Sequence, residues 1–397
     1  MLLLQPKSLQ ISTQLSFVQY EKVSTMDVDI KSFHFDGGDI RAKAILNSEQ
    51  IDFQVSSHAL SFASPVWKEF ISLSFPRLCE GPETRGSPSE KKAKRTASFD
   101  LDHILNFIVI LDFTEDKIDA LLILLQIAHL QFANIPKRLP YETLHGVAVL
   151  CEQYDCKKLV KPWLADWLKE DWNESNMRGQ EGWLFIAWCF GRHGILSELA
   201  MTCVLQANIG DGGECMIDGG FHYPRPYCGS TPVDSYPLEK DGILLPLDIV
   251  ESILDTRQEA IEQIVTAVYG VVEKFEGKKK HDHMQQEPGC SFACDAINLG
   301  FLVKALQKED LWPRPSPGDI RMSIHDLVKI LYRIDRFTSR RPAPSGCEWP
   351  ARDHTNCFPP GHLSSVVTSA LSSVPTPVLD SHMSYMDTAS LEVGLLD

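Results

Sequence analysis

The chain has 397 residues, of which 44% are hydrophobic and 23% charged, and its formal net charge is -15. This is the composition of a globular protein with room for two domains, each with its own core. The negative charge argues against a general nucleic-acid binder, because such a protein needs a basic face that replaces counterions.

The 11 cysteines do not have the spacing of a small disulfide-linked domain. We therefore expect reduced thiols in a nuclear or cytosolic protein. No apolar run reaches the length that spans a membrane, so no membrane contact is expected. Residues 1–25 lack a signal peptide, and residues 1–32 are predicted to be disordered. Whether the protein starts at Met1 or Met26 stays open.

A β-hairpin and a helix are predicted near the N-terminus. After an Asp-Gly-Gly-Asp turn, apolar and polar residues alternate from Ile40 to Leu46 and again from Ile51 to Val55, with a polar turn between the two runs. Ser64 and Pro65 then supply the cap and the first-turn proline of a helix.

The residues of this hairpin and helix resemble the start of a BTB/POZ domain. The pattern is closest to that of fungal BTB proteins, roughly F-x-V-S-S-H-x-L-x-x-A-S-P-V. The matching residues are Gly38, Asp39, Phe53, Val55, Ser56, Ser57, His58, Leu60, Ala63, Ser64, Pro65 and Val66. Trp67 stands where the family usually has Phe. The resemblance implies that His58 holds the turn into the helix rather than acting as a base, because the motif places no partner nucleophile or carboxylate.

An insertion and a third strand are expected next. Residues 76–98 are rich in Gly, Pro and charge, which predicts a flexible insertion. The apolar run 106–112 indicates a strand covered on both faces. Apolar stripes then predict helices, and the segment Cys151-x-x-Tyr154-Asp155-Cys156 again resembles the family. The BTB domain is expected to span residues 33–170.

Strand signals are scarce in the rest of the chain. Residues 181–208 are predicted to form a helical extension, residues 209–245 a loop and residues 246–335 a helical region. Residues 336–362 carry Cys and His, and the Ser-, Thr- and Pro-rich residues 363–397 are predicted to be a disordered tail. The predicted fold class is α+β: a BTB/POZ domain with a small β-sheet flanked by α-helices, followed by an α-helical C-terminal region.

One group of residues near the C-terminus has the chemistry of a metal site. Cys290 and Cys294 lie one helical turn apart, and His354 and Cys357 follow as His-x2-Cys. Zn²⁺ binds four thiolate or imidazole ligands in a tetrahedron, so these residues would supply a structural zinc site. The spacing is looser than that of a zinc ribbon, and buried reduced cysteine is common, so packed or free thiols are the favoured alternative. No other cofactor is expected.

No catalytic signature occurs in the chain. It lacks Gly-x-Ser-x-Gly, a Walker loop, His-Glu-x-x-His and a dinucleotide fingerprint. We therefore expect neither an enzyme nor a small-molecule substrate. The alternative, an enzyme of unrecognised type, predicts a pocket with shifted ionisation around His354 and Cys357.

Two short elements bear on compartment and partners. A compact basic cluster consists of Lys91, Lys92, Lys94 and Arg95. A nuclear import signal and a solvated charge run fit this cluster equally, so the expected location is nucleus, cytoplasm or both. Leu78 and Glu80 match the hydrophobic-x-Glu element of cullin-binding BTB domains, although a chance match is the simpler interpretation of three residues.

The resemblance implies a protein–protein interaction module. One hypothesis is an adaptor or scaffold, including a substrate adaptor of a cullin-type ubiquitin ligase. The alternative is a dimerising nuclear regulator of transcription without its own DNA-binding domain, because no zinc-finger pattern is present. The expected partners are proteins, with a second copy of the chain and a cullin among them, and not nucleic acid.

Overall fold

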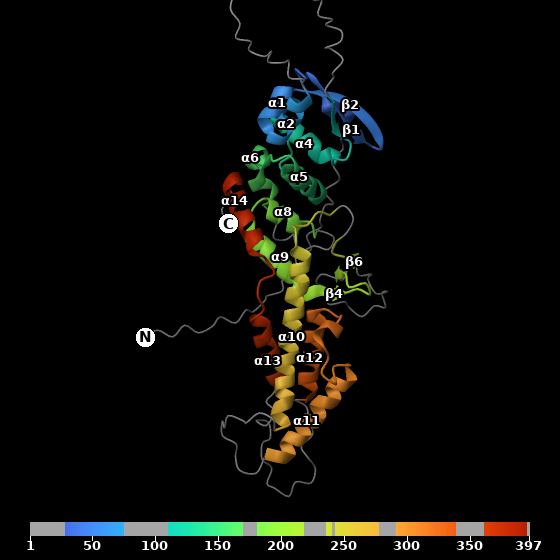
Figure 1. Cartoon of the computed structure of the whole chain (residues 1–397), viewed down its shortest axis with the longest axis vertical. Coiled ribbons are helices and arrows are strands. Elements are labelled where there is room, and N and C mark those ends of the chain that lie inside the picture. Colours follow the sequence, from blue (N-terminus) through green and yellow to red (C-terminus); the bar gives the residue numbers. More distant parts are fainter. Residues whose placement is uncertain are drawn as a thin grey trace, which may run out of the picture.

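The computed structural model describes residues 28–74, 110–169, 181–217, 236–239, 243–277, 291–338 and 361–394. Within these residues the chain combines α-helices and small β-sheets and is mostly helical, which confirms the mixed class. Figure 1 shows an elongated molecule with one sheet at one end and a bundle of helices at the other. None of the described helices is long and apolar enough to cross a membrane.

The first sheet is built on the predicted hairpin. β1 (Ile40–Leu46) pairs antiparallel with β2 (Glu49–Val55). Asn47 and Ser48 close the turn with φ of 53° and 69°, the backbone that suits the twist of a two-residue hairpin. β3 (Ile110–Phe113) pairs parallel with β1, so the strand order is β2-β1-β3.

The third strand differs from the predicted one. The described strand starts at Ile110, and its exposure alternates: Ile110 and Asp112 are exposed, whereas Leu111 and Phe113 are buried. Over the described residues the expectation of a strand covered on both faces is wrong, because only the face that carries Leu111 and Phe113 is buried. The hydrogen bond from Lys43, at 2.8 Å, lowers the pKa of the exposed Asp112 to about 2.

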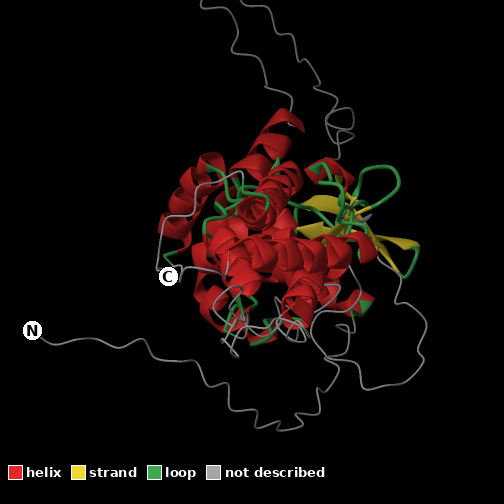
Figure 2. Ribbon diagram, turned by 90° about the horizontal axis from the view of Figure 1, so that it is seen from below, coloured by secondary structure: helices red, strands yellow, loops and turns green. Residues whose placement is uncertain are grey.

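A group of helices packs beside this sheet, which lies at one side of the helical mass in Figure 2, and among them α4 contacts β1. The helices of this group are α1 (Ser57–Ala63), α2 (Pro65–Ser74), α4 (Ile118–Ala128), α5 (Tyr141–Gln153) and α6 (Lys157–Trp167). α4 is the central helix and buries all its residues from 120 to 127. It needs more than the single apolar stripe of a surface helix because β1, α1, α5 and α6 all pack against it.

The middle of the chain adds helices and a second small sheet. α8 (Trp183–Cys189) and α9 (His193–Gln206) form the predicted extension. β4 (Ala207–Ile209), β5 (Cys215–Ile217) and β6 (Tyr236–Pro237) then pair in the order β4-β5-β6. The segment 209–245, predicted to be mostly loop, contains β5 and β6 among its described residues, and strands of two or three residues are too short to show an alternating pattern in the sequence.

The far end of the molecule is a helical bundle. α10 (Ile249–Phe275) runs along it, shown in yellow in Figure 1, and packs against α9, α11 (Ser291–Lys308) and α13 (His362–Ser372). α12 (Ile324–Thr338) follows the short 3-10 helix η3 (Pro317–Asp319) and packs on α11 and α13.

Both ends of the chain contain more structure than predicted. η1 (Ile30–Phe33) overlaps the end of segment 1–32, which is predicted to be disordered, and Phe33 is buried. The disordered tail is a wrong prediction, because α13 and α14 (Asp380–Val393) lie there. Its Ser- and Thr-rich composition hid apolar residues at helical spacing, and the buried ones are Leu363, Val367, Met386, Ala389 and Val393.

Candidate interaction surface

Asp39 organises the corner between β2 and α1. Its carboxylate accepts hydrogen bonds from the backbone N–H and the hydroxyl of Ser57, both at 2.6 Å, while the Ser56 hydroxyl caps α1. Burial raises the pKa of Asp39, but the Ser57 hydrogen bonds together lower it further, so the pKa lies below its ordinary value. A Cβ on Gly38 would lie 2.7 Å from the Cβ of Gln54, which leaves no room for a side chain.

His58 does not take the role that the resemblance implied. Its ring is exposed, and its Nδ1 lies 3.3 Å from the Ser57 hydroxyl. His129, at the end of α4, holds the corner instead: its Nε2 accepts the Ser56 N–H at 2.9 Å, and its Nδ1 donates to the carbonyl of Leu125 at 2.7 Å. Sequence reasoning missed His129 because it lies 73 residues from Ser56.

The remaining motif residues build the core beneath this corner. The Ser64 hydroxyl accepts the Trp67 N–H at 3.0 Å and donates to the carbonyl of Tyr154 at 2.5 Å. Trp67 is fully buried, with its ring 5.1 Å from that of Tyr154 and 6.3 Å from that of Phe113. Pro65 begins α2, and the other buried motif residues are Phe53, Val55 and Leu60.

α1 and α2 present apolar side chains to solvent. Phe62 is 96% exposed, Phe70 is 47% exposed, and Pro65 and Val66 lie between them in the chain. We call these four residues the Phe62 face. A phenyl ring in water forgoes about 1.5–3 kcal/mol of burial free energy, which contact with another protein would recover.

A second exposed feature is the turn after α4. Leu130 has φ of 61° and is 74% exposed. Leucine is uncommon in this left-handed region, and such strain persists only where the surroundings over-determine it. Here His129 is bound to Ser56, and Gln131 binds the carbonyls of Gln126 and His34, at 2.8 and 2.9 Å.

Aromatic rings extend this turn onto α6. Phe132 is 50% exposed, and its ring centroid lies 5.5 Å from that of the half-buried Trp163. We call Leu130, Phe132 and Trp163 the Leu130 corner. The Leu130 corner therefore exposes large apolar side chains, and the hydrogen bonds of His129 and Gln131 fix the backbone at Leu130.

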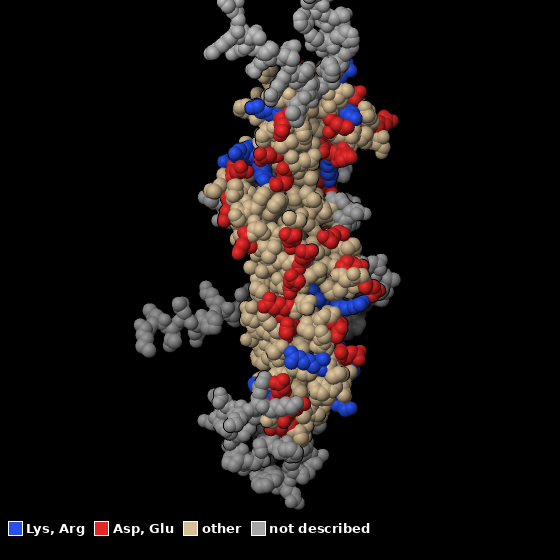
Figure 3. Space-filling view, in the orientation of Figure 1, with Lys and Arg blue, Asp and Glu red and all other residues tan. Residues whose placement is uncertain are grey.

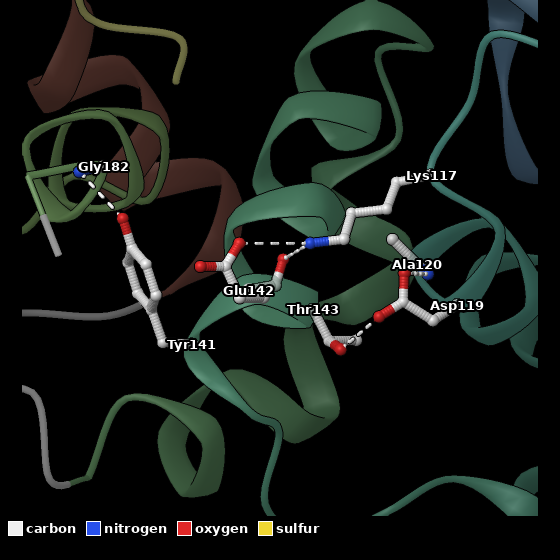
Figure 4. Close-up of polar contacts among 7 residues, drawn as sticks. All are labelled: Lys117, Asp119, Ala120, Tyr141, Glu142, Thr143 and Gly182. Carbon is white, nitrogen blue, oxygen red and sulfur yellow. Dashed lines mark hydrogen bonds and ion pairs between the residues drawn. The ribbon is translucent and has the colours of Figure 1, made fainter. Parts of the chain in front are cut away.

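Polar contacts fasten the start of α4 to α5, and α5 to the start of α8 (Figure 4). Lys117 binds the carbonyl of Glu142 at 2.6 Å, and the Thr143 hydroxyl donates to Asp119, so the start of α4 is fixed on α5. The N–H of Gly182 donates to the Tyr141 hydroxyl at 3.0 Å, which joins α5 to the start of α8. Figure 4 shows these side chains engaged with one another rather than directed at a shared cavity.

The buried thiols and the Tyr141 hydroxyl stay uncharged near neutral pH. Burial raises the pKa of Tyr141 and of the thiols of Cys151, Cys189 and Cys203, and it raises that of Cys215 to about 11. A protonated thiol is a poor nucleophile, so these cysteines suit packing rather than covalent catalysis.

Several predicted site residues lie outside the described residues. These are Leu78, Glu80, Lys91, Lys92, Lys94, Arg95, Cys290, His354 and Cys357, together with the side chain of Cys294 and the insertion 76–98. The zinc site, the cullin-binding element, the import signal and the enzyme pocket all stay predictions. Among the residues that the structure does describe, no group of three or more His, Cys, Asp or Glu side chains could hold a metal ion.

Comparison with known proteins gives no match: no family model, no curated protein and no solved structure matches this chain. Function is therefore argued from the two exposed surfaces, which sequence reasoning missed. Phe62 gave one usable signal, because it stands two positions after the buried Leu60 and so points to the other side of a helix. Leu130 gave none, because its exposure depends on distant hydrogen bonds.

Proposed function

We propose that this chain is a protein–protein adaptor or scaffold of the BTB/POZ type. The Phe62 face serves self-association, and the Leu130 corner binds a different protein. The observation that carries the proposal is the Phe62 ring, which is 96% exposed on a short helix that Ser56 and Asp39 hold rigidly.

The energetics favour a protein partner for this face. Burying one phenyl ring contributes about 1.5–3 kcal/mol, which is a factor of ten or more in a dissociation constant. Because α1 is preorganised by its cap and by the Asp39 hydrogen bonds, little conformational entropy is lost on association. An apolar ring on a rigid helix is therefore suited to be an interface anchor.

The Leu130 corner supports the adaptor function. Two separate apolar sites allow one chain to pair with a second copy and still hold another protein. A cullin-type scaffold is the partner that the resemblance implies, and the motif residues Asp39, Ser56 and Ser64 support that resemblance by making the contacts that hold the hairpin and helices together.

The test begins with the mass of the purified full chain by light scattering. We expect a dimer for the wild type and a monomer for Phe62→Asp, because a carboxylate cannot be buried unpaired in an apolar contact. The matched control is Leu247→Ser, which removes an equally apolar side chain, 79% exposed, from the loop before α10.

The second step identifies partners by affinity purification and mass spectrometry from the protein's own cells. Recovery of a cullin with the wild type, and its loss with Leu130→Ser combined with Phe132→Ser, supports the ligase adaptor. Chromatin proteins without a cullin would favour the regulator of transcription. A wild type that is monomeric at all concentrations and recovers no partner would contradict the proposal.

A further inference from the structure

The C-terminal helix folds back onto the N-terminal part of the molecule. In Figure 1, α14 lies beside α6 and α8, whereas α13, which precedes it, packs on α10 and α12 at the other end. The face of α14 that carries Met386, Ala389 and Val393 is buried. α14 is therefore an arm that leaves one part of the chain and packs on another.

A single tyrosine forms the polar centre of this contact. The Lys157 ammonium donates to the Tyr385 hydroxyl at 2.5 Å and pairs with Glu152 at 2.7 Å, and Tyr385 also donates to Glu152. The Tyr385 ring stacks on Trp188 with centroids 3.9 Å apart and planes 9° apart. The partners of Tyr385 lie on three helices: Glu152 on α5, Lys157 on α6 and Trp188 on α8.

Gly191 allows the backbone of α14 to approach. It has φ of 70°, and a Cβ here would lie 2.7 Å from the backbone nitrogen of Ser390 and 2.8 Å from the carbonyl oxygen of Met386. The nearest atoms to that Cβ all belong to α14. We call Glu152, Lys157, Trp188 and Gly191 the α14 seat.

The seat does not lose its charge balance when the helix leaves. Lys157 keeps Glu152 at 2.7 Å, so no buried charge is left unpaired. The contact of His193 with Asp387, at 3.3 Å, is partly exposed and adds little to stability. A helix of 14 residues is marginal alone in water, so α14 needs a seat, whether on its own chain or on another.

The charges of α14 and α6 are complementary, and Figure 3 shows basic and acidic side chains next to one another where these two helices lie in Figure 1. α14 contains Asp380, Asp387 and Glu392 and no Lys or Arg, whereas α6 contributes Lys157, Lys158 and Lys161. A second copy of the chain offers the same seat, with Lys158 and Lys161 of α6 beside it, and the same acidic helix. It is therefore the one partner whose residues are known to satisfy every contact.

We propose that α14 is an exchangeable arm, and that the α14 seat is a docking site for the C-terminal helix of a second copy of this chain. In its own chain the arm has an effective concentration in the millimolar range, so exchange becomes visible when one seat is blocked and another is left empty. This proposal is independent of the Phe62 face.

The test is complementation between two full-length variants, both carrying Phe62→Asp so that the Phe62 face does not contribute. The first adds Gly191→Ala, which blocks its seat and frees an intact arm. The second adds Tyr385→Ala, which weakens its arm and leaves its seat open. We expect each alone to be monomeric, and the mixture to form a complex of one copy each, at least about tenfold tighter than either self-pair.

Two matched controls keep the arm on its own chain. Gly194→Ala replaces Gly191→Ala, because a Cβ at Gly194 meets nothing within 4 Å. Leu391→Ser replaces Tyr385→Ala, because Leu391 is 76% exposed on the outer side of α14. The control mixture should stay monomeric.

Two results overturn the proposal. One is a mixture of folded Gly191→Ala and Tyr385→Ala chains, verified by circular dichroism, that remains monomeric. The other is a failure of either variant to fold, since α14 would then be an inseparable part of the core rather than an arm.

Discussion

Removal of the Arg257 side chain should weaken the C-terminal region. Its guanidinium, on α10, is 3% exposed and donates to the carbonyls of Ala207, Ile320 and Met322, at 2.9, 2.8 and 2.7 Å. Burial lowers its pKa, but arginine remains charged at any ordinary pH. One side chain therefore joins α10 to β4 and to the loop before α12.

The cost of Arg257→Met follows from the carbonyls left behind. Those of Ala207 and Ile320 belong to buried residues, and an unpaired buried carbonyl costs about 1–3 kcal/mol. Met322 is half-buried, so water can replace the lost donor there. Removal of a buried charge returns part of this cost, and we expect a loss of about 3 kcal/mol in the free energy of unfolding.

The assay is urea denaturation followed by circular dichroism. The matched control is Arg321→Met. Arg321 lies in the loop before α12, and its ion pair with Asp211, at 2.8 Å, is exposed to solvent. An exposed ion pair contributes less than about 1 kcal/mol, so this control should unfold nearly like the wild type. If Arg257→Met also loses less than about 1 kcal/mol, the carbonyls have other donors and the reasoning is refuted.

Two further predictions concern the hairpin–helix corner. Burial lowers the pKa of His129 below 6.5, so its stabilisation is complete above about pH 6.5 and is lost as the pH falls through the lower folded value. The drop in the urea midpoint between about pH 6.5 and 5 should be smaller in His129→Gln than in wild type, and parallel curves would contradict this. Ser64→Ala should lower the free energy of unfolding by about 1–3 kcal/mol, because the Ser64 hydroxyl both accepts the Trp67 N–H and donates to the Tyr154 carbonyl. An unchanged midpoint would show that water replaces the hydroxyl.

The β1–β2 hairpin of the first sheet was predictable because its signals are local. Alternation from Ile40 to Leu46 matches the buried and exposed positions of β1, and the polar pair Asn47 and Ser48 suits positive φ. Helix starts were predictable where a cap and a proline adjoin, as at Ser64 and Pro65. Each of these signals lies within a few residues of the structure that it determines.

The C-terminal helices show the opposite case. Composition predicted a disordered tail, whereas α14 forms because Tyr385 reaches Lys157, 228 residues earlier in the chain. A short Ser- and Thr-rich helix is not stable by propensity alone, so its existence depends on the surface that receives it. No local pattern contains that surface.

For the candidate surfaces, too, some features follow from the sequence and others from the tertiary structure. The sequence by itself determined the hairpin, the caps and the motif residues that pack beneath the corner, because backbone preference and apolar spacing act over a few residues. Only the tertiary structure decided that Phe62 stays in solvent, that His129 rather than His58 holds the corner, and that α14 lies on α6 and α8. The physical reason is that exposure, burial and hydrogen-bond partners depend on which distant segments meet.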